Sequence, residues 1–204
     1  MKDRAVIGLC GRSGSGKSYV CKVFSSFGGL HLDTDRIYHD LLLPSDGVLS
    51  PCSAALSAAF GEDIIGEDMT PNSKKLGSIV FSDPEKLDLL NKITHKYIFE
   101  KTMQIVNETC APFYVMDAPV LFESGFDKYC DFTVCVTADD EICIERIMKR
   151  DGADRERAVK RLSAQISVES LRERCDYEIV NNGTEDIGSR IKNILIETGL
   201  YHEI

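Results

Sequence analysis

The sequence predicts an α/β fold in which helices flank a five-stranded parallel sheet. The first of five predicted strands, residues 5–10, is a short apolar run without polar alternation, as expected for a strand that is buried on both faces. Helical segments separate them, and strands that alternate with helices favour a parallel sheet. A chain of 204 residues, of which 43% are hydrophobic, is long enough for one such domain with insertions.

The expected core consists of residues 1–35, 111–145 and 175–204. Its strands are predicted at 5–10, 30–33, 113–117, 132–137 and 177–180. Its helices are predicted from Lys17 to about Phe27, from Asp139 to Arg150 and from Thr184 to Thr198. Glycines follow the first helix at positions 28 and 29, where a helix typically ends.

Two further segments are predicted to be helical and to lie outside this core, within a single unit that spans residues 1–204. Residues 36–110 form an insertion, with a helix start at Asp83-Pro84 and an irregular stretch between Gly61 and Pro71. Residues 146–174 are rich in arginine and glutamate and poor in large apolar side chains. That composition is typical of a mobile lid.

Charge and composition argue against nucleic acid and membrane as partners. The net charge is −9, whereas a nucleic-acid-binding protein usually carries a basic surface. A few cationic side chains in a cleft can still bind a small anion. No apolar run approaches the roughly 20 residues of a membrane span, and the N-terminus lacks a signal-peptide pattern. We therefore expect a cytoplasmic monomer whose eight cysteines, none of them in a C-x-x-C pair, are reduced.

The most specific motif lies between the first predicted strand and helix, and it predicts ATP binding. It fits G-x-x-x-x-G-K-[ST] and consists of Gly11, Arg12, Ser13, Gly14, Ser15, Gly16, Lys17 and Ser18. Glycines let several backbone N–H groups converge on a phosphate at a helix N-terminus. Lys17 is expected to reach the β- and γ-phosphates, and Ser18 to bind Mg²⁺. The alternative is a glycine-rich turn that only connects a strand to a helix.

Carboxylates follow two of the predicted strands, where a parallel sheet opens onto its ligand crevice. Asp33 or Asp35 could orient or deprotonate an acceptor hydroxyl, or could simply cap the helix that begins near Arg36. Asp117 ends its strand as a Walker B aspartate does, and is expected to hold Mg²⁺. The residues from 119 to 122 are expected either to pack in the core or to line an acceptor pocket.

Two arginines four positions apart, Arg146 and Arg150, share one face of a predicted helix. Paired guanidinium groups suit phosphate binding and can stabilise charge on a phosphoryl group in transfer. A solvated helix face is the alternative. Both arginines precede Asp151-Gly152 at the start of the predicted lid, and this position supports the phosphate-binding hypothesis and the solvated face about equally.

Over almost its whole length the chain resembles the dephospho-coenzyme A kinase family. The resemblance is carried by ordered motifs: the phosphate loop, Asp33–His39, Phe60–Ile64, Val80–Pro84, Ile93–His95, Asp117 with 119–123, Arg146–Gly152, Arg161 with Gln165, and Asp176–Gly183. It implies that ATP phosphorylates the ribose 3′-hydroxyl of dephospho-coenzyme A, the last step of coenzyme A synthesis. The chain differs from the family pattern at Cys10, Arg12, Ser13, Lys96 and Phe99. The Arg12 side chain could supply a compensating positive charge.

The resemblance also assigns roles to residues. Asp33 would be the catalytic base, assisted by Lys17 and by Arg146 from the lid. Nucleotide binding would use the phosphate loop, Arg146, Arg150, Asn182 and Gly183. The acceptor would contact the insertion and the following residues: Asp33, Asp35, His39, His95, Asp117, Pro119, Leu121, Phe122, Glu123 and Arg161.

Three other functions share the phosphate loop. Another kinase of the nucleoside monophosphate type would have the same loop and lid but a different acceptor. A regulatory GTPase would require a guanine-binding N-K-x-D, which Asn181–Thr184 does not provide, and a D-x-x-G after the third strand, which is absent. A nucleotide-binding module without catalysis would not require the carboxylates and the lid.

Overall fold

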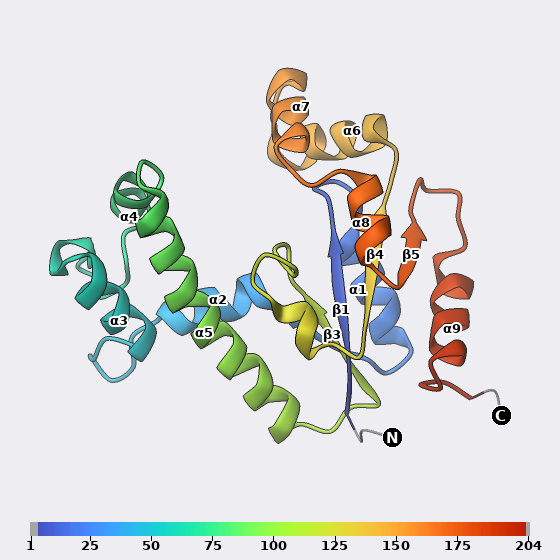
Figure 1. Cartoon of the computed structure of the whole chain (residues 1–204), viewed down its shortest axis with the longest axis horizontal. Coiled ribbons are helices and arrows are strands. Elements are labelled where there is room, and N and C mark those ends of the chain that lie inside the picture. The colour runs from blue at the N-terminus through green and yellow to red at the C-terminus, as the bar shows by residue number, and fades with distance from the viewer. Residues whose placement is uncertain (1–3, 203–204) are drawn as a thin grey trace. The chain divides into compact units, whose positions relative to one another are not determined.

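A computed structural model describes residues 4–202 of the chain. Its sheet has the order β2-β3-β1-β4-β5, and Figure 1 labels all of these strands except β2. The strands are β1 (Ala5–Gly11), β2 (Leu30–Asp33), β3 (Phe113–Asp117), β4 (Phe132–Thr137) and β5 (Tyr177–Val180). The pairs β1–β3, β1–β4 and β4–β5 are parallel. The predicted fold class is therefore confirmed, and each strand lies within one residue of its predicted bounds.

The parallel arrangement brings the carboxyl ends of the strands to one edge of the sheet. Leu9 of β1 is in register with Asp117 of β3, two residues before the phosphate loop begins at Gly11. On the other side Gly11 pairs with Val136, and Thr137 of β4 pairs with Val180 of β5. Residues that follow four strands far apart in sequence therefore meet around the loop.

The main core lies between the sheet and two helices, α1 (Lys17–Ser26) and α9 (Ile187–Glu197), which also contact each other. Both helices bury one apolar stripe, as amphipathic helices on a sheet do. The fully buried members of this core include Ile7, Leu9, Val20, Phe24, Val115, Val134, Ile179 and Ile191. The helix predicted from Thr184 begins only at Ile187, because the Asp186 carboxylate accepts a hydrogen bond from Ser189 N (3.0 Å) and caps it there.

The segment predicted as a lid folds into helices α7 (Arg155–Ser163) and α8 (Val168–Arg174) after α6 (Asp140–Asp151). Helix α6 starts and ends one residue later than predicted, and its C-cap is Gly152, whose φ of 62° suits glycine. Although large apolar residues are few here, α6 and α7 share a small core. Its buried members are Ala138, Cys143, Ile144, Ile147, Ala158 and Leu162. The remaining element after β3 is the short helix η2 (Phe126–Tyr129).

The described chain divides into two compact units. The first contains the residues up to Leu32 and those from Cys110 onward, including the predicted lid, and the second runs from Asp33 to Thr109. The second unit is helical: α2 (Thr34–Leu42), α3 (Pro51–Phe60), η1 (Glu62–Ile64), α4 (Ser73–Val80) and α5 (Pro84–Glu108). It has its own core, which includes Leu56, Ile64 and Val80.

Cap residues set where the helices of the second unit begin. Asp83 accepts hydrogen bonds from Glu85 N (3.1 Å) and Lys86 N (3.2 Å), and Pro84 then opens α5. The helix predicted to begin near Arg36 instead starts at Thr34. Its cap is Asp33, which accepts a hydrogen bond from Arg36 N at 3.0 Å. None of the helices in residues 4–202 is both long and apolar enough to cross a membrane.

Candidate nucleotide and catalytic site

The phosphate loop requires glycine at two positions. Gly14 has a φ of 81° and Gly16 a φ of 90°, in the region that side chains with a Cβ rarely adopt. A Cβ on Gly14 would also collide with the backbone of Cys143, and one on Gly16 with the side-chain amide of Asn181. Gly16 is the N-cap of α1, so the loop leads directly to the first, unpaired N–H groups of that helix.

Two side chains hold the loop by donating hydrogen bonds to its backbone carbonyl oxygens. Arg146 Nη1 donates to the carbonyl oxygens of Gly14 (3.2 Å), Ser15 (3.4 Å) and Asn181 (3.0 Å). The buried Asn181 donates from Nδ2 to Ser15 O at 2.8 Å. Arg146 therefore lies against the loop, and the alternative of a solvated helix face is wrong for this residue.

Arg150 differs from Arg146 although both lie on α6. It is exposed, its Nη2 lies 3.4 Å from Ser13 Oγ, and its Nε lies 2.7 Å from Asp151 Oδ1. Asp151 also pairs with Arg161 at 2.8 Å. The hydrogen bond from Arg150 holds the pKa of Asp151 below its usual value, and the same bond raises the pKa of Arg150. Arg150 and Arg161 thus form one exposed charge cluster with Asp151.

Arg12 and Ser13, two of the departures from the family pattern, tie the loop to the helices that follow β4. Arg12 Nη1 lies 2.7 Å from Asp140 Oδ1 at the start of α6, and its Nη2 donates to Leu162 O at 3.2 Å. Ser13 N donates to Gln165 Oε1 at 2.8 Å. The Arg12 side chain is only 10% exposed, so its charge is engaged within the protein.

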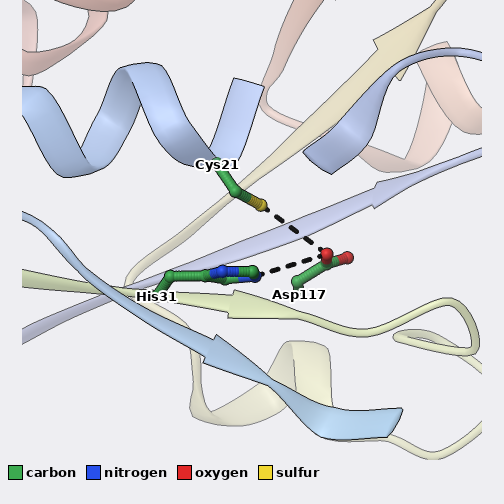
Figure 2. A group of neighbouring side chains, drawn as sticks. All are labelled: Cys21, His31 and Asp117. Atoms are coloured by element: carbon green, nitrogen blue, oxygen red, sulfur yellow. Dashed lines mark hydrogen bonds and ion pairs between the residues drawn. The ribbon is translucent and has the colours of Figure 1, made fainter. Parts of the chain in front are cut away.

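Asp117 faces Lys17 with one carboxylate oxygen. Its other oxygen faces Cys21 and His31, as Figure 2 shows. Lys17 Nζ is 3.1 Å from Asp117 Oδ1. Asp117 Oδ2 is 3.4 Å from His31 Nε2 and accepts the thiol of Cys21 at 3.6 Å. Burial alone would raise the pKa of Asp117, but its interactions with His31 and Lys17 outweigh burial and lower it. The carboxylate is therefore ionised at neutral pH.

Four of the predicted acceptor residues lie in the second unit. Asp33 caps α2, which confirms the capping interpretation for this residue. Asp35 and His39 lie in the first and last turns of the same helix, and both are exposed. His95 is partly buried in α5, and burial lowers its pKa.

The residues after Asp117 line a cavity of about 270 Å³ in the first unit. Its wall is made by Gly11, Arg12, Pro119, Val120, Leu121, Phe122, Glu123 and Gln165, with four neighbours. Leu121 is also buried, whereas Arg174 stacks on the Phe122 ring at 4.0 Å from its centroid. Core packing and pocket lining, which the sequence left as alternatives, therefore apply together to this segment.

The remaining predicted residues lie at the end of the phosphate loop and in the turn after β5. Ser18 is exposed in the first turn of α1. Asn182 Oδ1 accepts a hydrogen bond from Asp139 N at 2.9 Å, and Gly183 N donates to Glu185 Oε2 at 3.0 Å. These bonds shape the turn that follows β5 beside the start of α6.

Sequence reasoning missed four residues that contact this site. Asn181 lies in the motif Asp176–Gly183, which carries part of the resemblance, so that motif could have selected it in place of Asn182. Cys21 follows Lys17 by one helical turn, and i, i+4 spacing puts both on one face of α1. Gln165 belongs to a motif that carries the resemblance, but the motif assigned no role to its contact with Ser13. His31 carries no comparable signal, because only the fold places it against Asp117.

Comparison with known proteins agrees with this geometry. The family model described as dephospho-CoA kinase (CoaE) matches residues 5–186. A dephospho-CoA kinase of Lactobacillus johnsonii is 34% identical over 198 residues, covering 95% of this chain and 98% of that protein.

Two solved structures are similar over most of their length. TT1252 from Thermus thermophilus aligns with a TM-score of 0.81 and 30% identity, over 96% of this chain and 98% of that one. A dephospho-CoA kinase from Campylobacter jejuni aligns with a TM-score of 0.64 and 25% identity, over 97% and 100%. The predicted resemblance is confirmed: the chain belongs to the dephospho-CoA kinase family.

Proposed function

We propose that the chain transfers the γ-phosphoryl group of ATP to the ribose 3′-hydroxyl of dephospho-coenzyme A, giving coenzyme A and ADP. The observation that carries the proposal is the loop from Gly11 to Ser18, held in shape by Arg146 and Asn181, in a member of this family. Such a preformed cradle lowers the cost of ordering the loop around a phosphate.

The loop has the features that a phosphate chain needs. Ser15 Oγ is buried and has no hydrogen-bond partner among the described residues. Gly14 and Gly16 adopt conformations that let the backbone approach an anion closely. Lys17 adds a cation that would move from Asp117 to the β- and γ-phosphates when a nucleotide binds.

We assign Mg²⁺ to Ser18 and Asp117, whose hydroxyl and carboxylate are the oxygen ligands that this ion prefers. Bound there with the nucleotide, the ion would neutralise charge on the phosphates. Asp117 fits this role because its carboxylate is ionised at neutral pH and already lies beside the phosphate-loop lysine.

In the proposed reaction Asp33 is the base that accepts the proton of the acceptor hydroxyl. Lys17 and Arg146 stabilise the phosphoryl group, and Arg150, Asn182 and Gly183 complete the nucleotide site as the segment 146–174 closes over it. The acceptor is held by side chains of the insertion and of the segment after β3, with one from α7: Asp35, His39, His95, Asp117, Pro119, Leu121, Phe122, Glu123 and Arg161. We also assign the protein to the cytoplasm, as a monomer.

The acceptor is tested by coupled ADP release with dephospho-coenzyme A and, in parallel, with a panel of nucleoside monophosphates. Turnover with dephospho-coenzyme A alone is expected. Phosphorylation of a nucleoside monophosphate without phosphorylation of dephospho-coenzyme A would show that the proposed acceptor is wrong.

The base is tested with Asp33→Asn. Asparagine caps a helix as well as aspartate does, so α2 should keep its start while proton transfer is lost. We expect turnover to fall roughly 10²- to 10⁴-fold with little change in ATP affinity. Asp83→Asn is the matched control, since Asp83 caps α5 in the same unit. Equal turnover in Asp33→Asn and Asp83→Asn would contradict the assignment.

A further inference from the structure

Three side chains of different chemistry converge on one point beside the phosphate loop. Cys21 comes from α1, His31 from β2 and Asp117 from the end of β3, and Figure 2 shows the thiol and the imidazole both directed at the carboxylate. One ligand atom from each lies within 4.8 Å of those of the other two. We propose that this cluster is a binding site for a soft divalent cation, Zn²⁺, distinct in its donor set from the oxygen ligands assigned to Mg²⁺.

The donor set favours zinc. A thiolate, an imidazole and a carboxylate are the three ligand types that Zn²⁺ accepts, and three protein ligands with an open fourth position are typical of its non-structural sites. Mg²⁺ takes oxygen ligands in octahedral geometry and does not select sulfur or nitrogen. Cys21 and His31 therefore add nothing to magnesium binding, whereas both are suitable zinc ligands.

The distances fit a tetrahedral ion closely. Zinc bonds of about 2.3 Å to sulfur and about 2.0–2.1 Å to nitrogen and oxygen, at tetrahedral angles, place sulfur about 3.5 Å and nitrogen about 3.3 Å from the carboxylate oxygen. Cys21 Sγ lies 3.6 Å and His31 Nε2 lies 3.4 Å from Asp117 Oδ2. Two of the three ligand–ligand edges are thus already set.

The two oxygens of Asp117 are used on different sides. Lys17 lies 3.1 Å from Oδ1, while Cys21 and His31 both face Oδ2. A cation on the Oδ2 side can therefore bind without displacing the lysine from Oδ1. The cost is repulsion between the cation and the lysine ammonium, which the thiolate charge of Cys21 offsets in part.

His31 supplies an independent reason to expect a ligand. Its Nε2 is buried and lies 3.4 Å from Asp117 Oδ2, but it makes no well-formed hydrogen bond among the described residues. A buried polar atom without a partner is costly. Coordination by its lone pair would satisfy it, since neutral imidazole is the commonest metal ligand in proteins. The His31 side chain is 31% exposed, which leaves a path for the ion, while Cys21 is buried.

Binding is tested directly with Co²⁺ as a spectroscopic probe for zinc on the full, reduced chain. We expect one equivalent of Co²⁺ to give a thiolate-to-cobalt charge-transfer band and the strong visible bands of tetrahedral cobalt, and Zn²⁺ to displace it. Cys21→Ser should abolish the charge-transfer band. His31→Gln, at a partly exposed position, should weaken binding at least roughly tenfold. Circular dichroism and the melting temperature confirm that both variants are folded.

Cys175→Ser is the matched control, because Cys175 lies beside a second thiol, that of Cys10, with 3.5 Å between their sulfur atoms, and so is a second place where a thiolate could bind the ion. It should keep the full cobalt spectrum. No charge-transfer band in the native chain, or a band that survives Cys21→Ser and is lost in Cys175→Ser, would overturn the proposed site. This measurement requires neither substrate nor turnover, so its result is independent of the proposed kinase reaction.

A zinc ion here would take an oxygen of the carboxylate that the proposed reaction gives to magnesium. We therefore expect micromolar zinc to inhibit ADP release at fixed Mg·ATP, measured relative to each variant's own zinc-free rate. The zinc concentration for half inhibition should rise at least roughly tenfold in Cys21→Ser and stay unchanged in Cys175→Ser. Equal sensitivity of the native chain and Cys21→Ser would show that zinc does not inhibit through this site.

Discussion

Replacing Gly16 by alanine tests how far the phosphate loop depends on the absence of one side chain. Gly16 has a φ of 90°, and alanine in such a conformation costs about 1 kcal/mol or somewhat more. The new Cβ also meets the Asn181 amide, so that amide must move away from Ser15 O, to which it donates at 2.8 Å. Losing that buried hydrogen bond adds about 1–2 kcal/mol. The total is therefore about 2–4 kcal/mol.

Gly199→Ala separates strain from collision. Gly199 belongs to the same compact unit and has a φ of 72°, but nothing lies within 4 Å of a Cβ placed there. It should lose only the conformational cost. For a chain of this size each kcal/mol lowers the melting temperature by about 2–4 °C. We therefore expect a fall of about 3 °C for Gly199→Ala and about 9 °C for Gly16→Ala in a thermal melt followed by circular dichroism.

Nucleotide titration provides the second measurement. Displacing Asn181 also disturbs its carbonyl oxygen, which accepts from Arg146 at 3.0 Å, so both supports of the loop are affected. ATP affinity should fall markedly in Gly16→Ala and remain native in Gly199→Ala. If both variants melt at the same temperature, or if Gly16→Ala binds ATP normally, the contact between Asn181 and the loop does not have the role assigned to it.

Two further substitutions test the charge of Arg12 and the burial of His95. Arg12→Met removes the pair with Asp140 and should weaken ATP binding, because the loop is then held less firmly to α6. The control Arg157→Met removes only an exposed pair and should leave ATP affinity unchanged. Isothermal titration measures the ATP affinity of both variants, and identical affinities would contradict a role for Arg12. Burial lowers the pKa of His95 in the folded chain, so the folded state favours the neutral imidazole. The pKa of histidine in an unfolded chain is about 6.5, and folding stability is therefore lost as the pH falls below that value. The drop in melting temperature between pH 7.5 and 5.5 should therefore be smaller in His95→Gln; an equal drop would refute this.

Much of the fold follows from local patterns. Strands buried on both faces leave continuous apolar runs, and this is why Phe113–Asp117 and Phe132–Thr137 were predicted with their observed bounds. Helix starts follow less directly from local patterns. The start of α9 depends on which carboxylate accepts a hydrogen bond from a backbone N–H group and so caps the helix. Glu185 accepts from Thr184 N and Asp186 accepts from Ser189 N, so both are candidates. Several residues near a helix end can act as its cap, so the pattern alone does not choose between them.

The sequence by itself determined the phosphate loop, because its eight residues are contiguous and their chemistry depends on backbone conformation and on the helix that follows. It also determined the family, because the order and spacing of the motifs can be read from the sequence without any knowledge of contacts. Only the tertiary structure decided which side chains support the loop. Arg146 and Asn181 reach Ser15 from positions 131 and 166 residues away.

The same holds for the cluster around Asp117. Its carboxylate was predicted as a magnesium ligand from its place at the end of a strand, yet Cys21 and His31 were not connected with it. Cys21 is 96 residues away in the chain, and a thiol in an apolar helix face reads as a small hydrophobic residue. The parallel sheet and the packing of α1 on β3 bring them together. Sequence patterns record the partners of the backbone, whereas the pairing of distant side chains is decided only when the sheet has formed.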